Sequence, residues 1–195
     1  MNELLSVAAA AWDKLVNYSY YLTYGKKGKL LKLELYFSAD RFMHIAGFQH
    51  LRDIQLPWAG SQKKMYERIL SGQIREEHIV KSAYYPDYVE PRLRAILMLG
   101  EMLEGNFSTF LFAPKRLPFY TDISAKYLIS DENAQIVFLF TDEECEKRLF
   151  PKSLFLKDKR DYTKNQTHLT LLKKERVNHL TGETVTLFCK VGYAE

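Results

Sequence analysis

The hydrophobic period of the chain changes near Asn106, and this change limits the folds open to it. Before Asn106, apolar residues recur mainly every three to four positions, the repeat of an amphipathic helix. After Asn106, they alternate with polar residues in short runs, the repeat of a half-buried strand. Helices followed by strands are typical of the α+β class, in which both halves share one core.

The region before Asn106 is predicted to contain one β-hairpin and a series of helices. Asn2 is expected to cap a first helix that ends near Asn17. Alternating residues on both sides of a Gly-Lys-Lys-Gly turn predict a hairpin over 18–37. The later helices are expected at 38–44, 50–54, 61–72, 74–84 and 91–105.

The region after Asn106 is predicted to contain strands separated by turns. They are expected at 107–112, 126–130, 135–140, 154–156, 167–173 and 183–189. The turn over 178–183 makes the last two strands an antiparallel hairpin. Because no repeat or linker is visible, we expect a single domain over 1–195, helix-rich over 1–105 and strand-rich over 106–195.

Composition indicates a globular protein of the cytoplasm. Hydrophobic residues make up 47% of the chain, too many for a disordered protein. Cys145 and Cys189 lack the spacing of a disulfide framework or a metal site, so we expect free thiols in a reducing compartment. No apolar run approaches the roughly 20 residues that cross a bilayer, and Glu3 and Asp13 replace the basic start of a signal peptide. We therefore expect no membrane association.

Positive charge is concentrated in one part of the chain. The segment 147–176 contains ten basic and three acidic residues, a net charge of +7. Since the whole chain has a formal net charge of +4, the remainder carries −3. Such a segment is expected to form a surface that meets a polyanion. A solvated basic face that binds nothing is the alternative.

Two histidines lie six residues apart in the segment 42–51, Phe-Met-His-Ile-Ala-Gly-Phe-Gln-His-Leu. His44 and His50 lack the four-residue spacing and the adjacent Glu of a helical zinc motif, so we expect no metal or other cofactor. Imidazole has an ordinary pKa of about 6.5, so either ring could transfer a proton at neutral pH. The alternative is that His44 packs within a short helix and His50 faces solvent.

The same stretch carries a resemblance to a known family. An alternating strand from Lys29 is followed by Phe42, His44 and Gly47. In this arrangement the stretch resembles the phage-associated branch of the Barnase/EndoU/colicin/RelE-like nucleases. The segment 150–155, Phe-Pro-Lys-Ser-Leu-Phe, and a closing hairpin with Thr-Gly-Glu extend the resemblance over most of the chain.

The resemblance implies an RNase-like fold in which an N-terminal hairpin and helices pack on a C-terminal, curved antiparallel sheet. It also implies metal-independent cutting of RNA, in which the 2′-hydroxyl attacks the adjacent phosphate. His44 is implied as the proton carrier and Lys152 as a stabiliser of phosphate charge. Ser153 and Gln166 are implied as hydrogen-bond donors to the phosphate.

A second candidate region, 160–168, precedes an expected strand and reads Arg-Asp-Tyr-Thr-Lys-Asn-Gln-Thr-His. Basic residues beside an aromatic ring suit RNA, because Lys and Arg meet phosphates and a tyrosine can stack on a base. An ordinary loop between two strands would have a similar composition. The residues predicted to contact RNA are Arg160, Tyr162, Lys164, Lys173 and Lys174.

Aromatic residues also cluster over 84–88, Tyr-Tyr-Pro-Asp-Tyr, between two expected helices. Most such rings lie in a core or an interface. A patch that binds a protein partner and a platform that stacks bases are the two functional alternatives.

Three functions are compatible with these features. The first is an RNase of phage or mobile-element origin, for instance a toxin module, with RNA and a protein inhibitor as expected partners. The second is a catalytically silent domain on the same scaffold that binds nucleic acid or protein. The third, a small-molecule enzyme with a pocket between helices and sheet, has the least support. The sequence does not indicate the oligomeric state.

Overall fold

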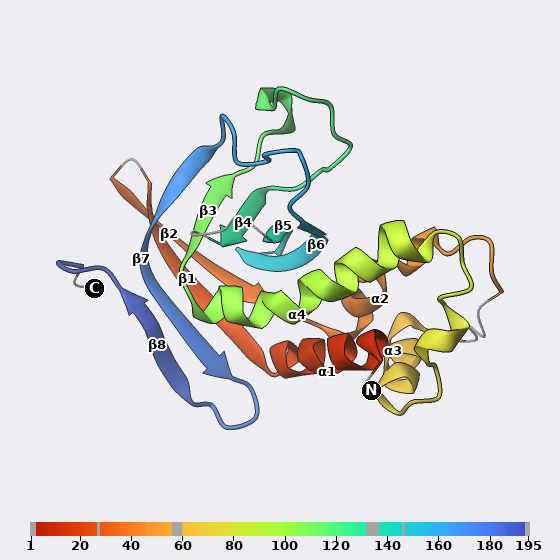
Figure 1. Cartoon of the computed structure of the whole chain (residues 1–195). Helices are drawn as coiled ribbons and strands as arrows, with labels where there is room; N and C mark the ends of the chain where they lie inside the picture. The colour runs from red at the N-terminus through yellow and green to blue at the C-terminus, as the bar shows by residue number, and fades with distance from the viewer. Residues whose placement is uncertain (1–2, 27, 56–59, 132–136, 146, 194–195) are drawn as a thin grey trace.

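The computed structural model describes residues 3–26, 28–55, 60–131, 137–145 and 147–193. It confirms the α+β class: helices occupy the first half of the chain and most strands the second (Figure 1). The four α-helices are α1 (Leu4–Val16), α2 (Phe42–Ile45), α3 (Gln62–Leu70) and α4 (Glu90–Glu104). The strands are β1 (Tyr18–Lys26), β2 (Lys29–Tyr36), β3 (Phe107–Leu111), β4 (Tyr127–Asp131), β5 (Val137–Cys145), β6 (Arg148–Leu156), β7 (Thr167–Asn178) and β8 (Thr184–Cys189).

Helices α1 and α4 form where the apolar residues recur at helical spacing. In α1 the buried face is formed by Leu5, Ala8, Ala9, Trp12 and Leu15. In α4 it is formed by Leu93, Ala95, Ile96, Leu99, Met102 and Leu103. These two faces pack against each other, and α4 also lies against β6 (Figure 1). The long helices therefore supply the helical part of the main core.

The expected curved, antiparallel sheet is confirmed only in part, because the sheet is mixed and closed. The strand order is β1-β2-β6-β5-β4-β3-β7-β8, and a further pairing joins β1 to β7. The first seven strands in this order thus form a barrel, and β8 extends beyond it (Figure 1). Closure pairs β1 with β7 and so removes the edge that β1 would expose in an open sheet.

Closure depends on β7, the longest strand. Thr167 to Leu169 pair with β3, whereas residues 170–178 pair with β1 on the other edge of the strand. The C-terminal part of β7 also pairs with β8. Sequence alternation is the same for an open and a closed sheet, so these long-range pairings could not be predicted from it.

The sheet is mixed because β2 and β6 run parallel. Their pairing is short: Glu34 lies opposite Arg148 and Leu35 opposite Leu149. Beyond Leu149, β6 keeps β5 as a partner on one edge only, and α2 lies against it. This half-open edge of β6 is where the exposed histidine of the motif makes contact, as described below.

Alternation along the strands produces two cores. One face of the strands joins the helices in the main core, with Tyr127, Ile129 and Leu139 among its members. The opposite face of β4 and β5 buries Leu128, Phe138 and Phe140. The loops before β4 and after β6 cover this second core.

Several boundaries differ from expectation. The helix expected over 74–84 is reduced to a 3₁₀ turn at Glu76–His78, and the one over 50–54 is replaced by a 3₁₀ turn at Phe48–His50. Strand β6 begins six residues earlier than predicted and includes Pro151, which sequence patterns exclude from a paired strand. Pro151 is tolerated because the β5–β6 register shifts beside it. The expected cap Asn2 lies outside the described residues.

The hairpin and the helix expected from position 61 are confirmed. Strands β1 and β2 pair antiparallel from Ser19 to Lys26 and from Lys29 to Tyr36. The Ser61 hydroxyl accepts a hydrogen bond from the Lys64 amide at the start of α3. Within the described residues, no helix is both long and apolar enough to cross a membrane.

Candidate functional site

The Phe-x-His-x-x-Gly segment, residues 42–47, is fixed at both ends and leaves its histidine exposed at the surface. Phe42 is buried in the main core, where its ring packs against Trp12 and Tyr66. Gly47 has φ of 84°, in the left-handed region that favours glycine. His44 lies between these anchors, on α2, and is exposed.

The His44 ring is oriented by the half-open edge of β6. Its Nε2 atom lies 3.1 Å from the carbonyl oxygen of Lys152. Because a carbonyl oxygen only accepts, Nε2 must carry the proton and donate. The neutral ring then has an unprotonated Nδ1, which makes no hydrogen bond to any of the described residues. A positioned imidazole with one open nitrogen is suited to accept a proton.

A second histidine lies close to the first. The His50 ring stacks on the ring of Tyr88, with centroids 4.5 Å apart and an interplanar angle of 25°. Arg92 lies four residues after Tyr88, and its guanidinium donates a hydrogen bond to the Tyr88 carbonyl oxygen. Its guanidinium also lies over the Phe155 ring, 4.9 Å from the centroid. His50, Tyr88 and Arg92 therefore form one continuous group.

The electrostatics of this group are cationic. Burial, followed by the positive charges of Arg92, Arg52 and His44, lowers the pKa of His50 below its ordinary value. Burial also lowers the pKa of Arg92. Within the described part of the chain, no carboxylate forms an ion pair with Arg52 or Arg92. His50, Arg52 and Arg92, which we call the His–Arg cluster, therefore present the positive charge of the two arginines to an anion beside His44.

Gly47 allows the segment to lie against the start of α4. A Cβ atom at this position would be 2.6 Å from the Tyr88 carbonyl oxygen and 3.0 Å from Cδ of Arg92. No side chain fits there without movement of the backbone. The glycine of the motif thus brings the histidine-bearing turn into contact with Tyr88 and Arg92.

A shallow depression adjoins His44. It has a volume of about 230 Å³ and is lined by His44, Met43, Phe48, Gln49, Gln62 and Met65. The lining combines apolar side chains, two methionines and Phe48, with the polar side chains of His44 and two glutamines. No three His, Cys, Asp or Glu side chains in the described ranges are grouped closely enough to hold a metal ion.

The resemblance implied that Lys152, Ser153 and Gln166 act together with His44, and the structure gives these three side chains different surroundings. Lys152 contacts His44 through its carbonyl oxygen, but its ammonium group lies 2.7 Å from Asp142 on β5. Ser153 is half-buried on β6 opposite Phe140, and its hydroxyl makes no hydrogen bond within the described residues. The Gln166 amide bonds to the backbone of Ala113 and thereby joins two loops. The Gln166 side chain therefore has a structural role in this conformation.

Two of the five residues predicted to contact RNA are buried, and three are not. Tyr162 is 3% exposed and packs within the second core, so its ring is not accessible to a base. Lys174 is 2% exposed, and its ammonium donates to the carbonyl oxygens of Leu103, Glu104 and Gly105 at the end of α4. Burial lowers its pKa to about 8. Neither side chain is available to a ligand in this conformation.

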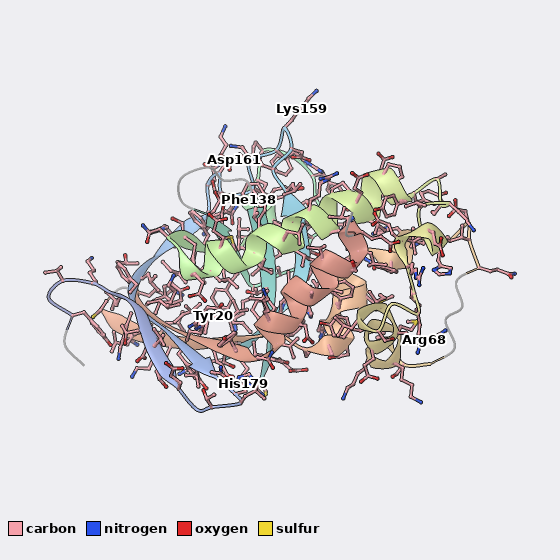
Figure 2. All side chains as sticks on the ribbon, turned by 60° about the horizontal axis from the view of Figure 1, so that its bottom comes forward. Tyr20, Arg68, Phe138, Lys159, Asp161 and His179 are labelled. Atoms are coloured by element: carbon pink, nitrogen blue, oxygen red, sulfur yellow. The ribbon has the colours of Figure 1, made fainter. Side chains whose placement is uncertain are left out.

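The other three predicted contacts are at the surface. Lys164 is exposed on the loop between β6 and β7. Arg160 on the same loop is paired with Asp158, and Lys173 on β7 is paired with Glu175, 3.1 Å away. Figure 2 shows Lys159 and Asp161 of this loop at one extremity of the molecule, far from Arg68 on α3.

The concentration of positive charge in the sequence is partly balanced in the structure. Arg148 pairs with Glu34 and Arg176 with Glu104, carboxylates that lie far away in the sequence. The charge count over 147–176 could not include them. By contrast, Arg52 and Arg92, which lie outside that segment, have no such partner among the described residues. Sequence reasoning missed both arginines and gave His50 no specific role, because only the fold brings them to His44.

Comparison with known proteins identifies the class. The chain matches a model of phage-associated nucleases related to barnase, EndoU, colicins and RelE. It belongs to the family described as phage-Barnase-EndoU-ColicinE5/D-RelE like nuclease4, whose model covers residues 4–190. The resemblance seen in the sequence is thereby confirmed. Searches of curated proteins and of solved structures give no match.

Proposed function

We propose that this family member is a metal-independent endoribonuclease of phage or mobile-element origin, with His44 as the group that moves the proton. The observation that carries the proposal is the state of His44: exposed, fixed through Nε2 by the Lys152 carbonyl, and open at Nδ1 beside the His–Arg cluster. Membership of a nuclease family supports this reading.

The proposed reaction needs only a base, an acid and positive charge. Nδ1 of His44 accepts the proton of the RNA 2′-hydroxyl, whose oxygen attacks the adjacent phosphorus. The bond from phosphorus to the 5′-oxygen breaks, and that oxygen takes a proton from a solvent water and leaves as a free hydroxyl. Protonated His44 then returns its proton to the solvent, which restores the starting state. The products are a 2′,3′-cyclic phosphate and a 5′-hydroxyl end. Arg52 and Arg92 would stabilise the negative charge that develops on the phosphate oxygens.

The experiment is cleavage of end-labelled single-stranded RNA in the presence of EDTA. We expect cleavage by the wild-type protein, 2′,3′-cyclic phosphate ends and no cleavage of DNA of the same sequence. His44→Gln should lower the rate by about 100-fold or more, because general acid–base catalysis contributes typically 10²–10⁴-fold. Circular dichroism and a thermal melt would verify that the variant is folded.

A matched control is available on β7. His168 is also exposed but lies outside the motif and packs against Phe110. His168→Gln should cleave RNA like the wild-type protein. Full activity in His44→Gln, or activity that requires a divalent metal ion, would contradict the proposed mechanism.

A silent binding domain is the second candidate, and one observation favours it. Two side chains implied as phosphate-stabilising groups are already engaged: the Lys152 ammonium with Asp142 and the Gln166 amide with Ala113. Such a domain would bind RNA with an affinity that falls steeply with salt concentration and would release no product. The cleavage assay distinguishes the two functions directly.

A further inference from the structure

Two exposed tyrosine rings lie beside the His–Arg cluster. Tyr84 and Tyr88 are 44% and 39% exposed, and their ring centroids are 6.1 Å apart in an edge-to-face arrangement. The His50 ring stacks on Tyr88. Neither tyrosine hydroxyl has a hydrogen-bond partner among the described residues. Large rings of this kind usually bury themselves, so their exposure here requires an explanation.

The segment that carries the tyrosines is rigidly held. Residues Tyr85–Val89 form a single π-helical turn directly before α4, a feature often found at functional sites. Between the two exposed rings, Tyr85 is buried and donates to Glu76. The Asp53 carboxylate accepts hydrogen bonds from the Ser82 hydroxyl at 2.5 Å and from the Ala83 amide at 2.8 Å. Tyr84 and Tyr88 are thus presented by backbone fixed at both ends.

The charges around the rings favour an anionic ligand with flat rings. Arg52 and Arg92 have no carboxylate partner within the described residues, and their charges act on His50. The nearby Asp53 carboxylate is occupied by Ser82 and Ala83. Asp87, on the same turn, is the opposing charge and is exposed. A single-stranded nucleic acid supplies both phosphates for the arginines and bases for the rings.

We propose that Tyr84, Tyr88 and His50 form a base-stacking platform that holds single-stranded RNA beside His44. The platform would bind the nucleotides next to the cleaved phosphate, and it would act without reading a particular sequence, because every base has a flat face. This inference rests on the proposed nuclease function for its biological role. The binding itself can be measured separately from cleavage.

The experiment measures binding of a short, fluorescein-labelled, mixed-sequence oligodeoxynucleotide to the full-length protein by fluorescence anisotropy. DNA lacks the 2′-hydroxyl that the proposed reaction needs, so binding is observed without cleavage. Tyr84→Leu and Tyr88→Leu keep an apolar side chain but remove the ring. Each should weaken binding roughly 5- to 100-fold, the range found when a stacking residue is truncated.

Three further variants make the result specific. Tyr120→Leu removes a tyrosine that is 85% exposed outside the platform, and it should bind like the wild-type protein. Tyr84→Phe and Tyr88→Phe should retain the affinity, since the ring and not the hydroxyl makes the contact. Asp87→Asn should strengthen binding by removing the opposing charge.

The outcomes separate the platform from the nuclease function. Weaker DNA binding in both leucine variants supports the platform, whether or not His44→Gln abolishes RNA cleavage. Affinities within twofold of wild type for Tyr84→Leu and Tyr88→Leu would overturn it, even if His44→Gln is inactive. No oligonucleotide binding by the folded wild-type protein would also overturn it and would favour a protein partner for the tyrosines.

Discussion

Single residues of the motif have clearly different tasks. Phe42 anchors the segment in the core, Gly47 permits the close approach to Tyr88, and His44 is left at the surface. The sequence shows only the spacing of these residues. The structure explains it: two structural residues flank one reactive residue, so the imidazole is exposed on a backbone that cannot easily shift.

At the residue scale, the charge around His50 leads to a prediction about pH. Its pKa is lowered in the folded protein by burial and by the positive neighbours Arg92, Arg52 and His44. Between this lowered value and the ordinary value of about 6.5, the unfolded chain binds more protons than the folded protein. The free energy of unfolding should therefore fall as the pH drops below about 6.5 through this window.

The measurement is an NMR titration of the His50 ring. Arg52→Gln removes an exposed positive neighbour and should raise the pKa of His50 towards its ordinary value. Arg116→Gln, whose side chain bonds to Thr167 elsewhere on the surface, should leave the His50 titration unchanged. An unaltered titration in Arg52→Gln would show that the His–Arg cluster is not electrostatically coupled.

At the scale of elements, the end of α4 is stabilised by a side chain from the sheet. The last carbonyl groups of a helix have no partner within the helix and carry partial negative charge. Lys174 of β7 donates to three of them, and its ammonium lies 4.7 Å from the Phe107 ring centroid. One lysine thus fixes the helix on the barrel, which explains why it is buried and not at an RNA-binding surface.

Replacement of this lysine should destabilise the protein strongly. Lys174→Met keeps most of the apolar volume but leaves the three carbonyl groups without their donor. We expect the free energy of unfolding to fall by about 2–4 kcal/mol, measured by urea denaturation. Lys190→Met, at an exposed position after β8, should change it by less than about 0.5 kcal/mol. Equal stability of the two variants would contradict this role of Lys174.

At the scale of the whole molecule, barrel closure creates contacts between strands that an open sheet would keep apart. Tyr24 on β1 and Thr109 on β3 lie beside opposite edges of β7. Their hydroxyl groups are buried and 2.8 Å apart. This hydrogen bond therefore depends on the pairing of β7 with both β1 and β3.

A double-mutant cycle tests this contact. Tyr24→Phe leaves the Thr109 hydroxyl buried without a partner and should cost about 1–3 kcal/mol of unfolding free energy. Thr109→Val removes the other hydroxyl, and the double variant should lose less than the two single variants together, by about 1 kcal/mol. Tyr120→Phe, at the surface, should have almost no effect. Strict additivity in chemical denaturation would argue against this hydrogen bond.

The sequence by itself determined the local structure and the family. The change of hydrophobic period correctly indicated helices before strands, because burial of one face imposes a period of 3.6 on a helix and of two on a strand. The first hairpin and the limits of α4 were predictable for the same reason. Phe42, His44 and Gly47 indicated the nuclease family, together with the preceding strand, the segment 150–155 and the Thr-Gly-Glu hairpin.

Only the tertiary structure decided which side chains meet. Closure of the barrel, the parallel contact of β2 with β6 and the pairing of Arg148 and Arg176 with distant carboxylates depend on residues far apart in the chain. For the same reason, burial removed Tyr162 and Lys174 from the candidate RNA surface. Periodicity records which face of an element is apolar but not which element covers it, so the grouping of His44 with His50, Arg52 and Arg92 required the fold.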